Sequence, residues 1–186
     1  MSRYTLKITG GTLRGRSLSE KGNSHIRPTS SRVREAIFNV LRDKIIGANV
    51  LDIYSGTGCL SLESISRGAR KATLVEKDEI AVALIEKNFS DMQLVSQYIL
   101  IKGASPTALG NLNGPYDLIF ADPPYTETIS NEEAIIISEL LSYDGLFVYE
   151  HRSSYNPAEY LGSMKIVERR KYGESTVSYF ESMESL

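Results

Sequence analysis

Apolar side chains near the start of this 186-residue chain recur at the spacing of a helix. Residues 30–45 carry them three and four positions apart, which places them on one helical face. These positions are Val33, Ile37, Val40, Leu41 and Ile45. Residues 29–31 follow Pro28 and supply Thr and Ser as N-cap candidates, so the pattern predicts a helix that starts near residue 30. Residues 4–18, with Gly10-Gly11 at their centre, predict a short hairpin before it.

Beyond residue 48 the pattern changes to short apolar runs that alternate with helical stretches. The runs at 49–55, 71–77, 97–103, 116–122 and 145–151 predict strands, and 60–68, 78–90 and 131–145 predict helices. This alternation is typical of βαβ units, and near-continuous apolar runs suit strands that are covered on both faces. Residues 164–173 and 175–182 predict two antiparallel edge strands joined by a turn at Gly173-Glu174. The sequence therefore predicts a doubly wound α/β fold with a mostly parallel sheet.

Length and composition favour one domain. A chain of 186 residues with 41% hydrophobic side chains can bury one good core. We divide it into an N-terminal extension, residues 1–46, and a core, residues 47–186. No apolar run approaches the length of a membrane span, and the N-terminus lacks the apolar segment of a signal peptide. Cys59, His25 and His151 have no metal-ligand spacing. We expect a cytoplasmic monomer without a metal.

Charge is divided unevenly along the chain. The net charge of −2 hides an N-terminal extension with ten basic and three acidic side chains, a balance of +7, so the remaining residues sum to −9. A basic region is either a solvated face or a surface that binds phosphates. Charge alone does not choose between these two interpretations.

A glycine-containing loop follows the first strand of the core. Gly56 and Gly58 allow a tight turn and a close backbone approach to a ligand, and the helix that follows can direct free N–H groups toward it. Glu76 ends the next strand, where an acid can accept both ribose hydroxyls. Ser61 stands where a dinucleotide-binding loop has its third glycine, which argues against NAD. Asp52 suits an ammonium group, so S-adenosylmethionine fits these features best, although an acid at a strand end can also simply cap the turn.

The sequence Asp122-Pro123-Pro124-Tyr125, the DPPY motif, ends a later apolar strand. An exocyclic base amine becomes nucleophilic only as its nitrogen becomes tetrahedral, and two hydrogen-bond acceptors favour that state. The Asp122 carboxylate and the Pro123 carbonyl can supply them and stabilise charge that develops on nitrogen. Tyr125 can stack on a flipped base. Such a tetrapeptide can also be an ordinary turn, but its place after the glycine loop and the ribose-type acid favours an acceptor site.

These motifs carry a family resemblance over nearly the whole chain. The DPPY motif with "LDIYSGTG" (51–58) resembles the amino-methyltransferases that use S-adenosylmethionine. "ITGGTLRGRSL" (8–18) and "RPTSSRVREAIFNVL" (27–41) are similar to the small bacterial 16S rRNA guanine-N2 methyltransferases of the ribosomal small-subunit methyltransferase D type. The resemblance implies a Rossmann-like methyltransferase sheet with an antiparallel C-terminal edge and a basic β-hairpin and helix extension. It also implies methylation of N2 of guanine 966 in 16S rRNA of the small subunit.

The resemblance also implies roles for individual residues. At the base it places Asp122, Pro123, Pro124 and Tyr125 as catalytic residues. At the cofactor it places Asp52, Tyr54, Ser55, Gly56, Gly58, Glu76, Lys77, Gly103, Ala104 and Asp122. At the RNA, or holding the N-terminal segment over the site, it places Arg14, Arg16, Arg27, Arg32 and Arg34. Gly103 departs from the family, which usually has Asp or Asn there to read the adenine amine, so backbone groups of Gly103 and Ala104 would have to substitute.

The sequence leaves three alternative functions to be compared with this interpretation. The enzyme could act on another base amine, adenine N6 or cytosine N4, although the chain has no room for a separate DNA-recognition domain. The chain could be a non-catalytic ribosome-assembly factor that binds RNA, although the intact DPPY motif argues against this. A dehydrogenase fails at Ser61 and has no use for the DPPY motif.

Overall fold

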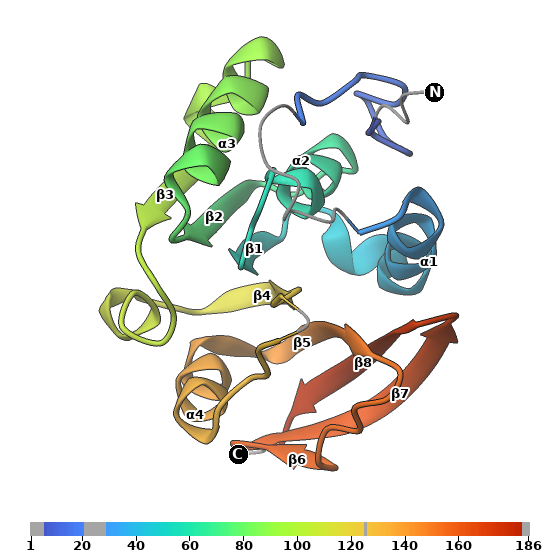
Figure 1. The fold of residues 1–186 in the computed structure, drawn as a ribbon, viewed down its shortest axis with the longest axis vertical. Helices are drawn as coiled ribbons and strands as arrows, with labels where there is room; N and C mark the ends of the chain where they lie inside the picture. Colours follow the sequence, from blue (N-terminus) through green and yellow to red (C-terminus); the bar gives the residue numbers. More distant parts are fainter. Residues whose placement is uncertain (1–5, 21–28, 125, 184–186) are drawn as a thin grey trace.

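The computed structural model describes residues 6–20, 29–124 and 126–183, and the strands of this part form one sheet in the order β3-β2-β1-β4-β5-β8-β7-β6 (Figure 1). The strands are β1 Asn49–Ile53, β2 Lys71–Glu76, β3 Tyr98–Lys102, β4 Tyr116–Ala121, β5 Leu141–Arg152, β6 Tyr160–Leu161, β7 Met164–Tyr172 and β8 Ser175–Ser182. Strands β1 to β5 pair in parallel, whereas β8, β7 and β6 continue the sheet antiparallel. The predicted fold class is confirmed.

The helices are α1 Ser31–Leu41, α2 Cys59–Ser66, α3 Glu79–Asp91 and α4 Asn131–Leu140, with short 3₁₀ turns at Arg42–Ile45, Val95–Gln97 and Leu109–Asn111. Side-chain caps start three of them. Ser30 accepts from the backbone N–H of the third residue of α1, Asp78 does so for α3, and Ser130 forms a reciprocal capping box with Glu133 in α4. These caps explain why the predicted starts of α1, α3 and α4 are correct to within a residue or two.

Helix α4 is shorter than predicted. The sequence predicts a helix over 131–145, but α4 ends at Leu140 and β5 begins at the next residue. Leu141 adopts an extended conformation and pairs with Tyr116 at the start of β4, where its side chain is buried. Pairing with the sheet therefore overrides the helical pattern of residues 141–145. The two-residue strand β6 had no signal in the sequence.

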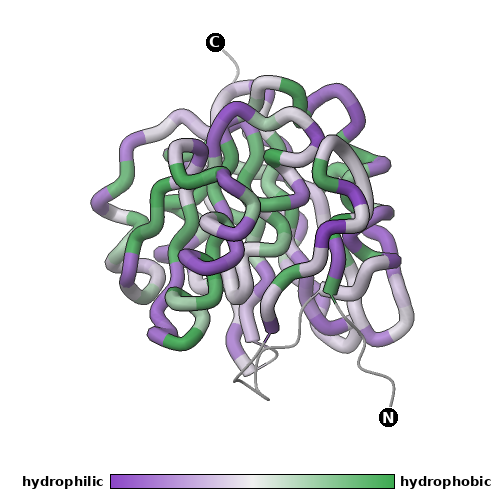
Figure 2. The backbone as a smooth tube through the Cα atoms, turned by 90° about the horizontal axis from the view of Figure 1, so that it is seen from above, coloured by the Kyte–Doolittle hydropathy of each residue, from purple (hydrophilic) through white to green (hydrophobic). Residues whose placement is uncertain are grey.

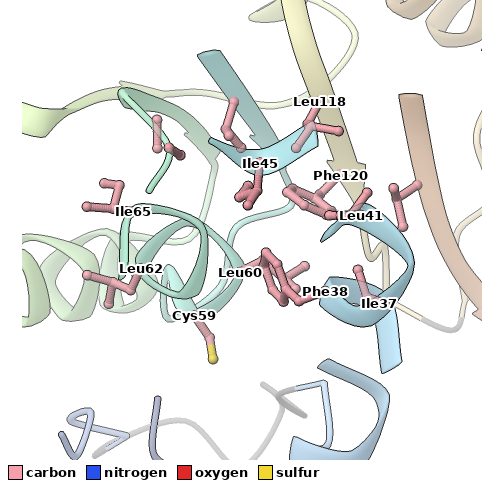
Figure 3. Close-up of a cluster of buried hydrophobic side chains, with 14 of the residues drawn as sticks. Ile37, Phe38, Leu41, Ile45, Cys59, Leu60, Leu62, Ile65, Leu118 and Phe120 are labelled. Carbon is pink, nitrogen blue, oxygen red and sulfur yellow. The ribbon is translucent and has the colours of Figure 1, made fainter. Parts of the chain in front are cut away.

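Two apolar clusters fill the two faces of the sheet. In β4, Leu118 and Phe120 pack with α1, α2 and α3, whereas Ile119 and Ala121 pack with α4. Figure 3 shows side chains of α1 and α2 meeting Leu118 and Phe120 of β4. Along the backbone, hydrophobic segments gather in the interior and hydrophilic ones lie at the periphery (Figure 2). Strands covered on both faces explain the near-continuous apolar runs.

Residues 6–20, which we call the head, form a hairpin-like turn on α2. Lys7 and Ser17 form an antiparallel bridge, and residues 10–15 make a wider turn than the predicted one at Gly10-Gly11. Gly11 has φ +76°, and a Cβ there would lie 1.8 Å from the Ser66 carbonyl oxygen. Only glycine lets the head approach α2 this closely. Its apolar side chains share the cluster with α1, α2 and α3.

Candidate active site

The site lies where the strand order reverses. Strand β1 has β2 on one side and β4 on the other, and the chain runs outward in both directions from this pair. Ile53 at the end of β1 pairs with Ala121 at the end of β4. The glycine loop and the DPPY motif therefore leave adjacent strand ends, at the crevice where open α/β sheets bind ligands.

The glycine loop has the backbone that its glycines predict. Gly56 has φ +55° and Gly58 has φ +74°, and Tyr54 also adopts a left-handed conformation with φ +61°. A Cβ on Gly58 would lie 3.2 Å from the Phe89 ring, so the position combines positive φ with little space. The Gly58 N–H donates to the Ser55 carbonyl oxygen at 2.8 Å, which closes the turn before α2.

Glu76 ties the end of β2 to this loop. Its Oε2 accepts from the Gly56 N–H at 2.8 Å, and its Oε1 accepts from the backbone N–H groups of Lys77 and Asp78 at 2.8 and 2.9 Å. Lys77 itself is exposed and pairs with Glu127 at 3.1 Å. Beside Glu76 the structure has a small pocket. It is lined by Ile53, Tyr54, Val75, Glu76, Lys77, Gly103, Ala104 and Ser105. Five of the predicted cofactor residues therefore line one pocket.

Asp52 is buried beneath the loop with 2% exposure. Its Oδ2 accepts from the Ser61 hydroxyl at 2.7 Å and from the Ser61 N–H at 3.2 Å. Burial raises the pKa of Asp52 to about 7, although the bonds from Ser61 act in the opposite direction. Ser61 thus occupies the position where a dinucleotide-binding loop has its third glycine, and its side chain holds Asp52 at the first turn of α2.

Glu133 of α4 was not singled out in the sequence, yet it lies next to this pocket. Its Oε1 accepts from the hydroxyls of Tyr54 and Ser105, both at 2.5 Å, and its Oε2 accepts from the Ser130 N–H at 2.9 Å. Burial would raise the pKa of Glu133, but the hydrogen bonds from Ser105, Ser130 and Tyr54 outweigh it and lower the pKa. The Ser-x-x-Glu capping box was a visible signal for the helix start but not for this contact.

In the DPPY motif, Asp122 is partly buried and its Oδ2 accepts from the Thr29 hydroxyl at 2.9 Å. Pro123 is buried, whereas Pro124 is exposed and its carbonyl oxygen accepts from the Glu127 N–H at 2.7 Å. Tyr125 lies outside the described residues. The strand thus ends in a tight turn that presents Asp122 at the crevice.

The predicted RNA-binding arginines divide into three groups. Arg14, Arg16 and Arg32 are exposed, and Arg16 donates to the Asp91 carbonyl oxygen at 3.0 Å. Arg27 lies outside the described residues. Arg34 is fully buried, with 0% exposure.

Of the two roles that the resemblance implies for Arg34, direct contact with RNA does not fit this burial, whereas its contacts agree with the other, which is to hold the N-terminal segment. Its Nη1 donates to the Thr29 carbonyl oxygen and its Nη2 to the Lys7 carbonyl oxygen, both at 2.6 Å. Its Nε lies 3.8 Å from Glu63, whose side chain is also 0% exposed. Arg34 lies on the face of α1 that packs against α2, so its charge is matched inside the protein. It joins the head, α1 and α2.

Among the described residues, no group of three or more His, Cys, Asp and Glu side chains is arranged to hold a metal ion. In the same part of the chain, no helix has the length and apolar character to span a membrane.

The profile of the family described as "Conserved hypothetical protein 95" matches residues 6–181. The chain belongs to this family. The protein named "Ribosomal RNA small subunit methyltransferase D" of Escherichia coli K12 is 33% identical to it over 134 residues, 72% of this chain and 67% of that protein. The Haemophilus influenzae protein of the same name is 30% identical over 139 residues, 72% of this chain and 71% of that protein. The family resemblance seen in the sequence is thus confirmed.

A solved structure agrees with this assignment. A hypothetical protein of Thermus thermophilus superposes with a TM-score of 0.81 at 29% identity, and the match covers 95% of this chain and 99% of that one. The family profile begins at residue 6, so it covers the head as well as the sheet. Family membership therefore concerns residues 6–181 and not only the glycine loop and the DPPY motif.

Proposed function

We propose that this protein is a cytoplasmic S-adenosylmethionine-dependent methyltransferase that modifies the exocyclic N2 amine of a guanine in 16S rRNA of the small ribosomal subunit. By family resemblance the nucleotide is guanine 966. The observation that carries the proposal is the register of β1 and β4, which brings the glycine loop and the DPPY motif to adjacent strand ends. Relatives named small-subunit rRNA methyltransferases support the substrate class.

The residues around the small pocket fit this cofactor. Glu76 lies beside the pocket as a hydrogen-bond acceptor for ribose hydroxyls, and the left-handed glycines leave the loop backbone open to close approach. Gly103 and Ala104 line the pocket with backbone groups that can read an adenine. Asp52 supplies a buried carboxyl group under the loop, close to where a cationic methionine end would lie. When bound, S-adenosylmethionine supplies a methyl group on an electrophilic sulfonium.

The DPPY motif provides the acceptor side. Asp122 and the Pro123 carbonyl are proposed to accept the two N–H bonds of the target amine, which stabilises the tetrahedral nitrogen as it takes the methyl group. The rigid turn holds both acceptors in one orientation, since prolines leave little backbone freedom. Tyr125 is proposed to stack on the base, which must be presented outside any duplex.

The N-terminal extension is proposed to bind the RNA. Arg14 and Arg32 are exposed, and the extension carries a balance of +7. Contacts to phosphates give affinity that decreases with salt. On this basis residues 1–46 are the RNA-binding part and residues 47–186 the catalytic core of one domain.

The test is methyl transfer from tritiated S-adenosylmethionine to small subunits from cells that lack this activity, followed by nucleoside mass spectrometry. We expect N2-methylguanosine at one 16S site. Asp122→Ala should abolish transfer while cofactor affinity stays within about threefold, because Asp122 acts on the amine. Asp144→Ala is the matched control, since Asp144 is exposed at the start of β5.

Two results would contradict the proposal. Full transfer by Asp122→Ala would exclude its role at the amine. Cofactor binding without transfer to subunits or naked rRNA would favour another base amine or a non-catalytic assembly factor.

A further inference from the structure

One hydrogen bond joins the N-terminal segment to the proposed catalytic carboxylate. The Thr29 hydroxyl donates to Asp122 Oδ2 at 2.9 Å, although the two residues are 93 positions apart. Thr29 is 7% exposed, so bulk water has little access to its hydroxyl. In the sequence Thr29 was only one of three candidate helix caps, and the structure gives the capping role to Ser30. The Thr29 hydroxyl is therefore available for another purpose.

The backbone of Thr29 is held in place from two directions. Ser30 caps α1 directly after it, and the guanidinium of Arg34 donates to the Thr29 carbonyl oxygen at 2.6 Å. The same guanidinium donates to Lys7 in the head. Thr29 thus belongs to a buried set of contacts rather than to a surface loop.

The other end of this set is also fixed. Glu63 in α2 lies 3.8 Å from Arg34 and accepts from the backbone N–H groups of Thr9 and Gly10, both at 2.8 Å. Four segments therefore converge: the head, α1, α2 and the DPPY motif. Movement of the Thr29 backbone would require Arg34 to lose a hydrogen bond inside the protein, which costs free energy because the charge is buried.

We propose that Thr29 is a positioning residue that sets the orientation of the Asp122 carboxylate for the target amine. This inference rests on the proposed function. An aspartate side chain rotates about two bonds, and a hydroxyl bonded to one oxygen fixes the carboxylate plane. A carboxylate can accept about four hydrogen bonds, so a bond from Thr29 is compatible with one from the amine. A carboxylate held before the reaction needs no reorganisation as charge develops on nitrogen.

The experiment compares three variants with the wild-type protein. Thr29→Val keeps the shape and removes the hydroxyl, and Thr29→Ser keeps the hydroxyl. Thr73→Val is the matched control, because Thr73 is also buried, at 5% exposure, and its hydroxyl accepts from Tyr116 at the start of β4, the end of that strand opposite the DPPY motif. Each is assayed for the single-turnover methyl-transfer rate on small subunits, for KM of the subunit and for cofactor Kd by calorimetry.

We expect Thr29→Val to lower the transfer rate about 10- to 100-fold, the range for loss of one hydrogen bond to a charged group. Subunit KM and cofactor Kd should change less than about threefold, because neither ligand needs the orientation of Asp122 to bind. Thr29→Ser should retain most of the rate, and Thr73→Val should resemble the wild type. If Thr29→Val does not fold, Thr29→Ala replaces it as the variant without a hydroxyl.

A crystal structure of Thr29→Val gives a result that does not depend on activity. We expect the Asp122 carboxylate to turn away from the orientation that it has in the wild-type protein. An unchanged carboxylate would overturn the inference, even if the wild-type protein transfers no methyl group and the proposed function fails. With an active wild type, an unchanged or faster rate in Thr29→Val would also overturn it, the faster rate because Thr29 would then obstruct Asp122. Parallel losses of rate, KM and Kd would show a merely structural role.

Discussion

The substitution Glu63→Ala tests how strongly the head is joined to the core. Glu63 has a fully buried side chain and accepts from Thr9 N, Gly10 N and the Thr9 hydroxyl at 2.8, 2.8 and 2.6 Å. It also pairs with Arg67 at 2.8 Å and lies 3.8 Å from Arg34. Alanine would remove all these acceptors at once. The buried charge of Arg34 would then lose the carboxylate that pairs with it in the described part of the chain.

The expected magnitude follows from burial. Breaking a buried ion pair on one side costs about 3–5 kcal/mol, because the remaining charge stays away from water. Single domains have about 5–15 kcal/mol of total stability, so Glu63→Ala removes a large share. The control is Glu86→Ala, another helical glutamate, which pairs with Lys102 at 3.0 Å while 49% exposed. An exposed pair contributes about 0–1 kcal/mol, and alanine is at least as good a helix former.

The assay is urea unfolding followed by circular dichroism, with amide hydrogen exchange of the head measured in parallel. Exchange distinguishes global destabilisation from release of the head alone, since the Ile8 and Gly15 amides are hydrogen-bonded within it. A loss of less than about 1 kcal/mol, together with unchanged exchange of these amides, would refute the reasoning. It would mean that Arg34 does not depend on Glu63.

Three further predictions concern the site and its surface. Gly58→Ala should lower Tm more than Gly173→Ala in thermal melts. Both glycines have positive φ, but only at Gly58 would an added Cβ meet a neighbouring side chain, 3.2 Å away. Equal decreases in Tm for the two variants would contradict this prediction. The folded-state pKa of Asp52 is raised to about 7 from the usual value of 3.8, so its contribution to stability is fully present below pH about 4 and is lost as pH rises through about 7. Urea unfolding should therefore show the wild type losing stability relative to Asp52→Asn across this range. A difference between the two proteins that does not change with pH would contradict this prediction. Arg32→Ala should weaken rRNA binding and reduce the slope of log affinity against log salt by about one. Arg170→Ala, which removes an arginine paired with Glu168 on β7, should leave the slope unchanged. Equal slopes for both variants would contradict the proposal that the N-terminal extension binds RNA.

Local patterns in the sequence were sufficient for most of the fold. Apolar runs located β1, β2 and β4, because strands buried on both faces must be apolar along their length. The antiparallel pair β7 and β8 was located by the turn at Gly173-Glu174 between two strand-like segments, although β7 is partly exposed and charged. Gly56 and Gly58 were informative because positive φ selects glycine. The order of the motifs along the chain then placed the glycine loop and the DPPY motif at neighbouring strand ends.

Contacts between distant segments could not be predicted in the same way. The resemblance left two roles open for Arg34, contact with RNA or holding the N-terminal segment, and the carboxylate that makes its burial possible belongs to a different helix. Glu63, within a stretch of Ser and apolar residues, was a weak sign of a buried acid. The bond between Thr29 and Asp122 had no signal, since a threonine before a helix is already explained as a cap. The contact of Glu133 with Tyr54 and Ser105 was hidden for the same reason.

The antiparallel end of the sheet bears on self-association. An edge strand with unpaired backbone groups can recruit a strand from another molecule. Here β6 pairs with β7 over only two residues, so most of the outer edge of β7 has no neighbouring strand in the described part of the chain. Along that edge β7 carries Lys165, Glu168, Arg169, Arg170 and Lys171. A second copy that approached to extend the sheet would have to desolvate these charges and bring like charges together. The composition of β7 therefore protects the protein against edge-to-edge aggregation.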